Sequence, residues 1–121
     1  MSTDADPPVI HVPTLWEQID GDRELLSDVA ALFKDDCPMR LDDCRAAVAA
    51  GDAERLARSA HSIKGAASTL AAQATYHAAY ALEKLGQTAN FADAPPAIAR
   101  LDAELKRLFE YLDRIEEWAP A

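Results

Sequence analysis

The sequence is short of glycine, aromatic residues and cysteine, and each shortage narrows the choice of fold. Its 121 residues include four glycines, and aromatic residues make up 7%. Half of the residues are hydrophobic, many of them alanine, which favours closely packed helices over a strand-rich sheet. Cys37 and Cys44 are seven positions apart, which on a helix is roughly 10 Å and too far for a disulfide. Because no paired Cys or Cys/His spacing occurs, we expect buried thiols and no metal site.

Basic residues and long apolar runs are scarce as well. Lysine and arginine number 12 against 21 acidic residues, so the net charge is -9. A molecule with this charge repels phosphate-rich surfaces, which argues against nucleic acid or an anionic membrane as partner. No stretch approaches the ~20 apolar residues that cross a bilayer, and the acidic N-terminus has no signal-peptide pattern. We therefore expect a cytoplasmic protein of one domain.

The N-terminal residues show no apolar periodicity. Residues 1–12 are predicted to be a flexible lead-in, with His11 inside it and without a role, and the folded domain is predicted over residues 13–119. Thr14 and Glu17 fit a capping box at the start of a short amphipathic helix. A helix this short is expected to cover one end of a larger bundle.

Four longer segments carry apolar residues at spacings of three and four, which is typical of amphipathic helices. They cover about residues 22–50, 52–70, 72–85 and 95–115. The first keeps its phase across Pro38, which favours one kinked helix over two separate ones, and Gly86 with Asn90 is predicted to end the third. The predicted fold is all-α: an antiparallel up-and-down four-helix bundle with the short additional helix at its N-terminus.

One polar strip on the second long helix stands out. At 100° per residue, His61 points about 140° from the centre of its apolar stripe, so its side chain should be exposed. Lys64, Gly65 and Ser68 follow on the same outward strip. A glycine inside a helix costs ~1 kcal/mol relative to alanine. That cost suggests a function for the open space next to His61.

These residue types suit the acceptance of a phosphoryl group. A neutral imidazole has a free ring nitrogen that can act as a nucleophile, and the Lys64 ammonium can offset charge on an incoming phosphoryl oxygen. Gly65 leaves room for a bulky group or a partner surface beside His61. The segment therefore predicts a phosphoryl acceptor.

The same segment resembles a known family motif. Residues 60–67 are Ala-His-Ser-Ile-Lys-Gly-Ala-Ala, which is similar to the A-H-x-L-K-G-x-A motif of the histidine-containing phosphotransfer (HPt) family. Leu70 and the pair Leu82-Glu83 also stand where the family commonly has a leucine and a Leu-Glu pair. The resemblance implies that His61 is phosphorylated, that Lys64 stabilises the phosphohistidine, and that Gly65 keeps the surface open.

Three positions depart from the family pattern. Many members have glycine and asparagine where this chain has Ser68 and Thr69, and another glycine where it has Ala71. The departures leave the core motif intact. They put in doubt the side-chain contacts to the phosphate and the way this helix ends.

The resemblance also implies a mechanism. A phosphoryl group would pass in line from a receiver phosphoaspartate to His61 and then to another receiver aspartate, with Mg2+ supplied by the receiver and no cofactor bound by this chain. The sequence has no glycine-rich phosphate loop, so we expect neither ATP binding nor autokinase activity. The protein is expected to be a monomer whose partners are response-regulator receivers, and a hybrid histidine kinase is a further possible partner. Ala57 and Ser68 are candidates for the face on which the receiver docks.

Two other functions were weighed against this one. The phosphoacceptor segment of a sensor histidine kinase would form a two-helix dimer, and its histidine is usually followed by Glu or Asp, whereas Ser62 follows His61. A helical adaptor in which His61 is incidental would leave the cost of Gly65 unexplained. An enzyme is the weakest choice, because no second residue is predicted to accompany His61 as a general base or metal ligand. His77 is interpreted as a packing or solvated side chain.

Overall fold

Helices make up almost all of the described chain. The structure is a computed structural model that describes residues 9–115. Its helices are α1 (Val12–Gln18), α2 (Arg23–Ala50), α3 (Ala53–Thr69), α4 (Gln73–Gln87) and α5 (Ala94–Ile115). Residues 9–115 contain no strand, which confirms the all-α class. None of these helices is long and apolar enough to cross a membrane.

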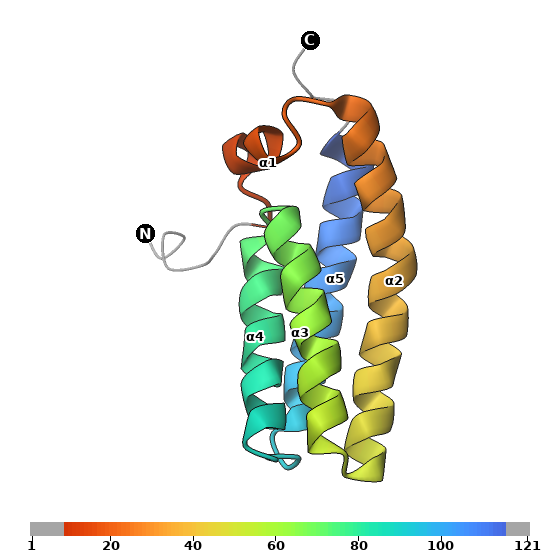
Figure 1. Cartoon of the computed structure of the whole chain (residues 1–121), viewed down its shortest axis with the longest axis vertical. Helices are drawn as coiled ribbons and strands as arrows, with labels where there is room; N and C mark the ends of the chain where they lie inside the picture. Colours follow the sequence, from red (N-terminus) through yellow and green to blue (C-terminus); the bar gives the residue numbers. More distant parts are fainter. Residues whose placement is uncertain (1–8, 116–121) are drawn as a thin grey trace.

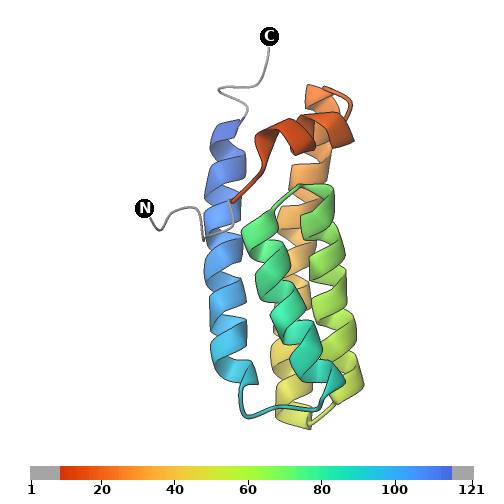
Figure 2. The same ribbon diagram turned by 90° about the vertical axis from the view of Figure 1, so that its left-hand side faces the viewer.

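The four long helices run alternately up and down and form a bundle (Figure 1). α2 packs against α3, α3 against α4, α4 against α5, and α5 against α2. Each long helix therefore has two neighbours, and α3 lies diagonally opposite α5. The short α1 lies across the end of the bundle where α3 ends and α4 begins (Figure 2). The predicted antiparallel bundle with a short N-terminal helix is confirmed.

Capping side chains mark the starts of α2 and α3, and a glycine in the left-handed backbone conformation ends α2. Asp22 and Asp52 cap α2 and α3 by accepting a hydrogen bond from the backbone N–H three residues on, at 3.0 and 3.1 Å. Gly51 ends α2 at φ +67°, a conformation that costs glycine nothing sterically. α2 continues through Pro38, so the prediction of a single helix there is confirmed.

The apolar stripe of α3 determines which way His61 points. All members of the predicted stripe are buried, with exposed fractions of 0%: Leu56, Ala60, Ile63, Ala67 and Leu70. Full burial of a leucine or isoleucine stabilises a fold by about 1.5–3 kcal/mol, so rotation of α3 about its own axis is strongly disfavoured. The opposite side of the helix, which carries His61, therefore faces solvent.

The packed part of the chain begins earlier than predicted. Ile10 is 5% exposed, and the backbone N–H of His11 donates a hydrogen bond to the Ala71 carbonyl at 2.9 Å. These contacts tie the start of α1 to the turn between α3 and α4, so residues 9–12 of the predicted lead-in belong to the packed unit. Residues 1–8 of that lead-in, and residues 116–119 of the predicted domain, lie outside the described residues.

His11 has a structural role that sequence interpretation did not assign. Its imidazole Nδ1 accepts a hydrogen bond from the backbone N–H of Thr14 at 3.4 Å and lies 2.7 Å from the Thr14 hydroxyl. His11 is thus the N-cap of α1, which begins at Val12. The predicted capping box of Thr14 and Glu17 was wrong, because Thr14 already lies inside the helix.

Gly86 and Asn90 were predicted to mark the end of the third long helix, α4, and the helix does end between them, at Gln87. Gly86 itself does not terminate the helix. The residue lies buried inside α4, and the left-handed position that follows the helix is Ala89, at φ +54°. A Cβ atom on Gly86 would lie 2.6 Å from the backbone nitrogen of Ala57 on α3. Gly86 therefore allows close approach of two helices.

Ala71, one of the departures from the family pattern, ends α3 in the left-handed conformation at φ +54° without being glycine.

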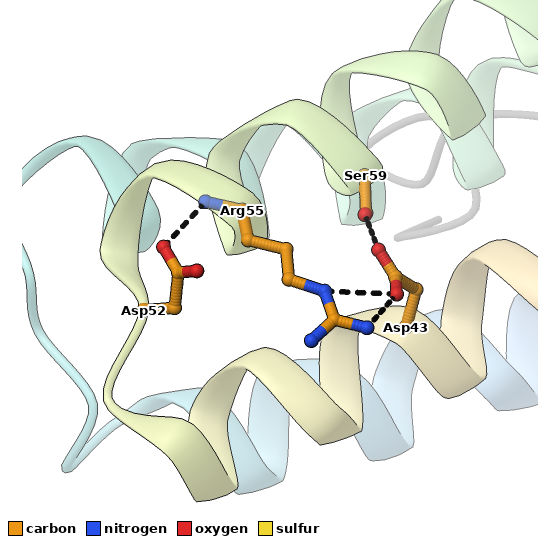
Figure 3. A network of polar contacts seen from close by, with 4 residues as sticks. All are labelled: Asp43, Asp52, Arg55 and Ser59. Carbon is orange, nitrogen blue, oxygen red and sulfur yellow. Dashed lines mark hydrogen bonds and ion pairs between the residues drawn. The ribbon is translucent and has the colours of Figure 1, made fainter.

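A polar network joins α2 to α3 just before His61 (Figure 3). The Asp43 carboxylate accepts hydrogen bonds from Nε of Arg55 at 2.9 Å and from the Ser59 hydroxyl at 2.5 Å. Ser59 is 4% exposed, and a buried hydroxyl is unfavourable without such a partner. Hydrogen bonds from Arg55 and then Ser59 hold the pKa of Asp43 below its ordinary value. The network thus connects α2 to the part of α3 that precedes His61.

We expect Asp43→Ala to lower the melting temperature by about 5 °C at pH 7, since it leaves the buried Ser59 hydroxyl without its acceptor. Because the Asp43 pKa is lowered in the folded state, its contribution is present above its ordinary pKa and is lost as pH falls below about 4. Thermal melts from pH 7 to pH 3 should thus show the difference from wild type shrinking. Asp42→Ala is the control, since Asp42 is exposed and pairs with Arg45 at the surface. Equal melting of both variants at pH 7 would contradict a structural role for the network.

Candidate functional site

His61 projects from the middle of α3 into solvent, as predicted, with a side chain 65% exposed. Its ring is nevertheless held in place, because Nδ1 lies 2.8 Å from Oε2 of Glu83 on the neighbouring α4. The other ring nitrogen, Nε2, has no hydrogen-bond partner among residues 9–115. The imidazole is therefore both exposed and oriented.

Glu83 is the residue that sequence reasoning missed. Its side chain is 9% exposed, and its two oxygens contact His61 and Lys64 separately. Burial acts to raise the Glu83 pKa, but the hydrogen bonds from Lys64 and His61 outweigh it and hold the pKa below its ordinary value. Glu83 is therefore ionised at neutral pH and can only accept a hydrogen bond. In the neutral form of the His61 ring, the proton is therefore on Nδ1 and the lone pair on Nε2.

Sequence reasoning predicted no general base or metal ligand beside His61, and it did not foresee the Glu83 carboxylate that lies there as a hydrogen-bond partner of the ring. The only sequence signal for Glu83 was its membership of the Leu82-Glu83 pair. The pair shows that an acid follows a core leucine, but not that it faces α3. Glu83 is 22 positions from His61 along the chain. The antiparallel packing of α3 against α4 brings the two side chains together.

Lys64 lies differently from the prediction. It was placed on the outward strip, but its side chain is 17% exposed, and Nζ lies 2.7 Å from Oε1 of Glu83. The ammonium also lies 4.8 Å from the ring centre of Tyr80 and 6.0 Å from that of Tyr76, within the range of cation–π attraction. The hydrogen bond to Glu83 raises the Lys64 pKa. The cation is thus present beside His61 but is held by α4.

Gly65 is open to solvent, and no contact within the described part of the chain requires a glycine there. A Cβ atom at this position would meet no atom within 4 Å, in contrast to Gly86. The backbone of Gly65 is in ordinary helical conformation, so it gains nothing from glycine's conformational freedom. Glycine lowers the stability of a helix by ~1 kcal/mol relative to alanine. No contact or backbone conformation among the described residues offsets this cost at Gly65.

The two predicted docking positions lie on either side of His61 along α3. Ala57 is half-buried against Gly86 and lines a shallow depression that also includes His61 and Glu83. Ser68 is exposed near the end of α3, and its carbonyl accepts a hydrogen bond from the Gln18 side chain of α1 at 3.1 Å. α1 therefore borders the surface that carries His61.

The other candidate side chains remain apart from this site. Cys37 and Cys44 are buried, as expected, and burial raises the pKa of each thiol to about 12. Such thiols stay protonated and unreactive at neutral pH. His77 is exposed on α4, with its ring edge-on to Tyr76. In the part of the chain that the structure describes, no three His, Cys, Asp or Glu residues gather into a group that could hold a metal ion.

Comparison with known proteins decides the family. The sequence profile of the Hpt domain matches residues 28–114, which include all of α3 and α4. This chain belongs to the Hpt domain family. No curated protein matches the sequence.

A solved structure agrees with the fold of this Hpt domain. The histidine-containing phosphotransfer protein B (HptB) of Pseudomonas aeruginosa superposes with a TM-score of 0.84. The two sequences are 24% identical, and the match covers 91% of this chain and 96% of that chain. At this identity the likeness shows the fold. A four-helix bundle within one chain also differs from the two-helix unit expected of a sensor-kinase segment.

Membership in the Hpt family establishes the general activity. The domain is a histidine phosphotransfer carrier of two-component signalling, and it is a carrier rather than a kinase. Its phosphotransfer partners are receiver domains of response regulators or kinases. His61 lies inside the matched residues and is the exposed histidine of the family motif.

Proposed function

We propose that this domain accepts a phosphoryl group on Nε2 of His61 from a receiver phosphoaspartate and passes it to an aspartate of another receiver. The observation that carries the proposal is the 2.8 Å contact between His61 Nδ1 and the ionised carboxylate of Glu83. This contact keeps the proton on Nδ1 and leaves the Nε2 lone pair on an exposed ring. An exposed, neutral imidazole is the nucleophile that the transfer needs.

Positive charge for the transfer is proposed to come from both sides of the complex. We expect the receiver to supply Mg2+, which offsets charge on the equatorial phosphoryl oxygens. We further propose that Lys64 stabilises the phosphohistidine. Its ammonium is 2.7 Å from Glu83, so it would turn from that carboxylate toward the phosphoryl group. This chain is proposed to bind neither ATP nor a cofactor of its own.

The receiver is proposed to dock on the strip of α3 that runs from Ala57 through His61 and Gly65 to Ser68. Small side chains along this strip let another backbone come close to the imidazole. Exposed apolar surface continues from the strip onto α2, where Leu32 is 68% exposed and lines a shallow groove between α2 and α3. Apolar surface of this kind is typical of the core of a protein–protein contact.

Transfer of labelled phosphate from phosphorylated receivers, with Mg2+ present, tests the proposal. We expect wild type to acquire acid-labile, alkali-stable label and His61→Gln to acquire none, because glutamine has no nucleophilic ring nitrogen. His77→Gln is the matched control, since His77 is also exposed but lies on α4, and it should be labelled like wild type. Chasing the labelled domain with a second, unphosphorylated receiver tests onward transfer.

Two outcomes would count against the proposal. Label that survives in His61→Gln would place the phosphoryl group on another residue. Receivers that bind the folded domain without any transfer would favour the adaptor function, in which His61 is incidental.

A further inference from the structure

We infer that three exposed carboxylates on α2, those of Asp28, Asp35 and Asp36, select the receivers that this domain binds. The receivers they favour have an apolar contact surface that is bordered by lysine or arginine. This inference rests on the proposed function and deepens it, because it adds which receivers fit. It concerns affinity and the choice of partner, and it leaves the transfer step itself unchanged.

An exposed apolar stripe runs along α2. Leu25, Leu32 and Met39 are seven positions apart, so they lie on one side of the helix, about two turns from one another. Leu32 and Met39 are 68% and 69% exposed. A single exposed leucine is ordinary on a protein surface, but a continuous apolar patch is typical of a contact with another protein. The stripe is therefore a candidate part of the docking surface.

The stripe lies within reach of a receiver that is seated on His61. The Asp43 carboxylate of α2 bonds to Ser59 of α3 at 2.5 Å, and the two helices are antiparallel. From that contact Met39 and His61 lie in the same direction along the bundle, about one turn and half a turn away. A standard contact buries about 800 Å² on each partner, a patch about 16 Å in radius, whereas packed helices are about 8–10 Å apart. A receiver that covers His61 therefore also covers the exposed side of α2.

Carboxylates flank the stripe on both sides of Leu32 along the helix. Asp28 is four positions before Leu32, and Asp35 and Asp36 are three and four positions after it. Side chains three or four positions apart on a helix are neighbours. All three aspartates are exposed, and Asp36 lines the same groove as Leu32. The apolar patch thus has an acidic border.

Little positive charge from the chain itself offsets this border. Arg40 pairs with Asp36 at 3.2 Å, and both side chains are about half exposed. Lys34 is directed to α5, where it pairs with Asp113. The other two carboxylates of the border have no ion-pair partner among residues 9–115. Their charges are available to a binding partner.

The surface on the other side of His61 has the opposite sign. α4 carries one acidic residue, the buried Glu83, and one basic residue, the exposed Lys84. The Lys84 and Lys64 ammonium groups lie 4.6 and 4.8 Å from the ring centre of Tyr80. The docking face is therefore negative over α2 and positive over α4. Such an arrangement fits a complementary partner in one orientation and disfavours the reverse one.

A second copy of this chain would be a poor partner for the stripe. Two stripes that meet at Leu32 would bring the three aspartates of each copy together, with Arg40 as the nearby cation of each. Like charges that face each other across a contact weaken it. A receiver with lysine or arginine in the same places converts this repulsion into attraction and is drawn to the surface faster at low salt.

Receiver binding to wild type, Asp35→Lys and Glu110→Lys tests the inference. Each substitution reverses one charge, but Glu110 is exposed on α5, away from the docking face. Two receivers are titrated, one rich in Lys and Arg around its phosphorylatable aspartate and one rich in Asp and Glu there. At low salt we expect Asp35→Lys to bind the basic receiver about tenfold more weakly than wild type, and Glu110→Lys to differ by less than about twofold. The difference should shrink at about 0.5 M salt, because dissolved ions screen exposed charges.

Two further measurements separate recognition from chemistry and from self-association. At a saturating concentration of phosphorylated receiver, Asp35→Lys should transfer within about twofold of the wild-type rate, because Asp35 does not contact the phosphoryl group. Leu32→Gln should weaken binding at every salt concentration, since burial of apolar surface is not screened by salt. Sedimentation of wild type and Leu32→Gln then reports whether the stripe joins two copies of the chain.

Equal affinities of Asp35→Lys and Glu110→Lys for the basic receiver would overturn the inference. A wild-type preference for the acidic receiver, or absence of binding by both receivers, would do the same. A wild-type dimer that Leu32→Gln converts to a monomer would assign the stripe to a second copy and would also overturn it. Because binding needs no transfer, receivers that bind as expected but leave no label on wild type would contradict the proposed function alone.

Discussion

Replacing Gly65 by glutamine is expected to slow phosphoryl transfer by about a hundredfold while leaving the domain folded. Apart from the neighbouring backbone of α3, a Cβ atom at this position meets no atom of the described residues within 4 Å. Glutamine is also a better helix former than glycine by about 0.5–1 kcal/mol. Side chains on a helix lean toward its N-terminus, and the residue one turn before Gly65 is His61. The glutamine would therefore lie over the imidazole and occupy the space that the receiver needs.

Transfer rates and thermal melts of the same preparations separate these two effects. We expect the melting temperature of Gly65→Gln to equal or exceed that of wild type. Ala103→Gln is the matched control, because Ala103 is exposed on α5, diagonally opposite α3, and this variant should transfer at the wild-type rate. Wild-type transfer by a folded Gly65→Gln would show that the open surface at Gly65 has no part in receiver docking.

Replacing Gly86 by alanine is expected to destabilise the domain by about 3 kcal/mol, although it adds only one methyl group. The new Cβ would lie 2.6 Å from the backbone nitrogen and 2.9 Å from the Cα of Ala57. Backbone atoms of a helix cannot turn aside as the end of a side chain can, so α3 and α4 must separate. Glu83 lies one turn before Gly86 on α4, so the separation should also weaken its contact with His61 and slow transfer.

Urea denaturation of Gly86→Ala and Gly65→Ala provides the measurement and its control. Both changes place alanine at a helical glycine, yet Gly65→Ala should stabilise the domain by up to about 1 kcal/mol because its Cβ is unobstructed. The two variants are thus expected to differ in sign. Equal stabilities would mean that α3 and α4 adjust to the added methyl group at little cost.

Local patterns were enough to predict the helices. The stripe of α3 was read from spacings of three and four, and it is buried throughout. The same periodicity placed His61 on the opposite side of α3, where its side chain is 65% exposed. Helix starts at Asp22 and Asp52 were also predictable, since a capping side chain acts on a backbone group three residues away.

Predictions failed where the meaning of a residue depends on a neighbouring helix. Gly86 looked like a stop signal, but it is buried against Ala57 of α3. His11 looked unstructured, yet its backbone bonds to Ala71 and its ring caps α1. Glycine and histidine have several uses in proteins, and the chain around them does not show which one applies.

The sequence by itself determined the helical class, the bundle, the exposure of His61 and the open position at Gly65, because these follow from periodicity and from residues within one or two turns. Only the tertiary structure decided how the imidazole is used. The packing of α4 against α3 brings Glu83 to Nδ1 of His61 and draws Lys64 inward. A hydrogen bond between residues 22 positions apart depends on the register of two helices, and that register is set by side-chain packing over the whole interface.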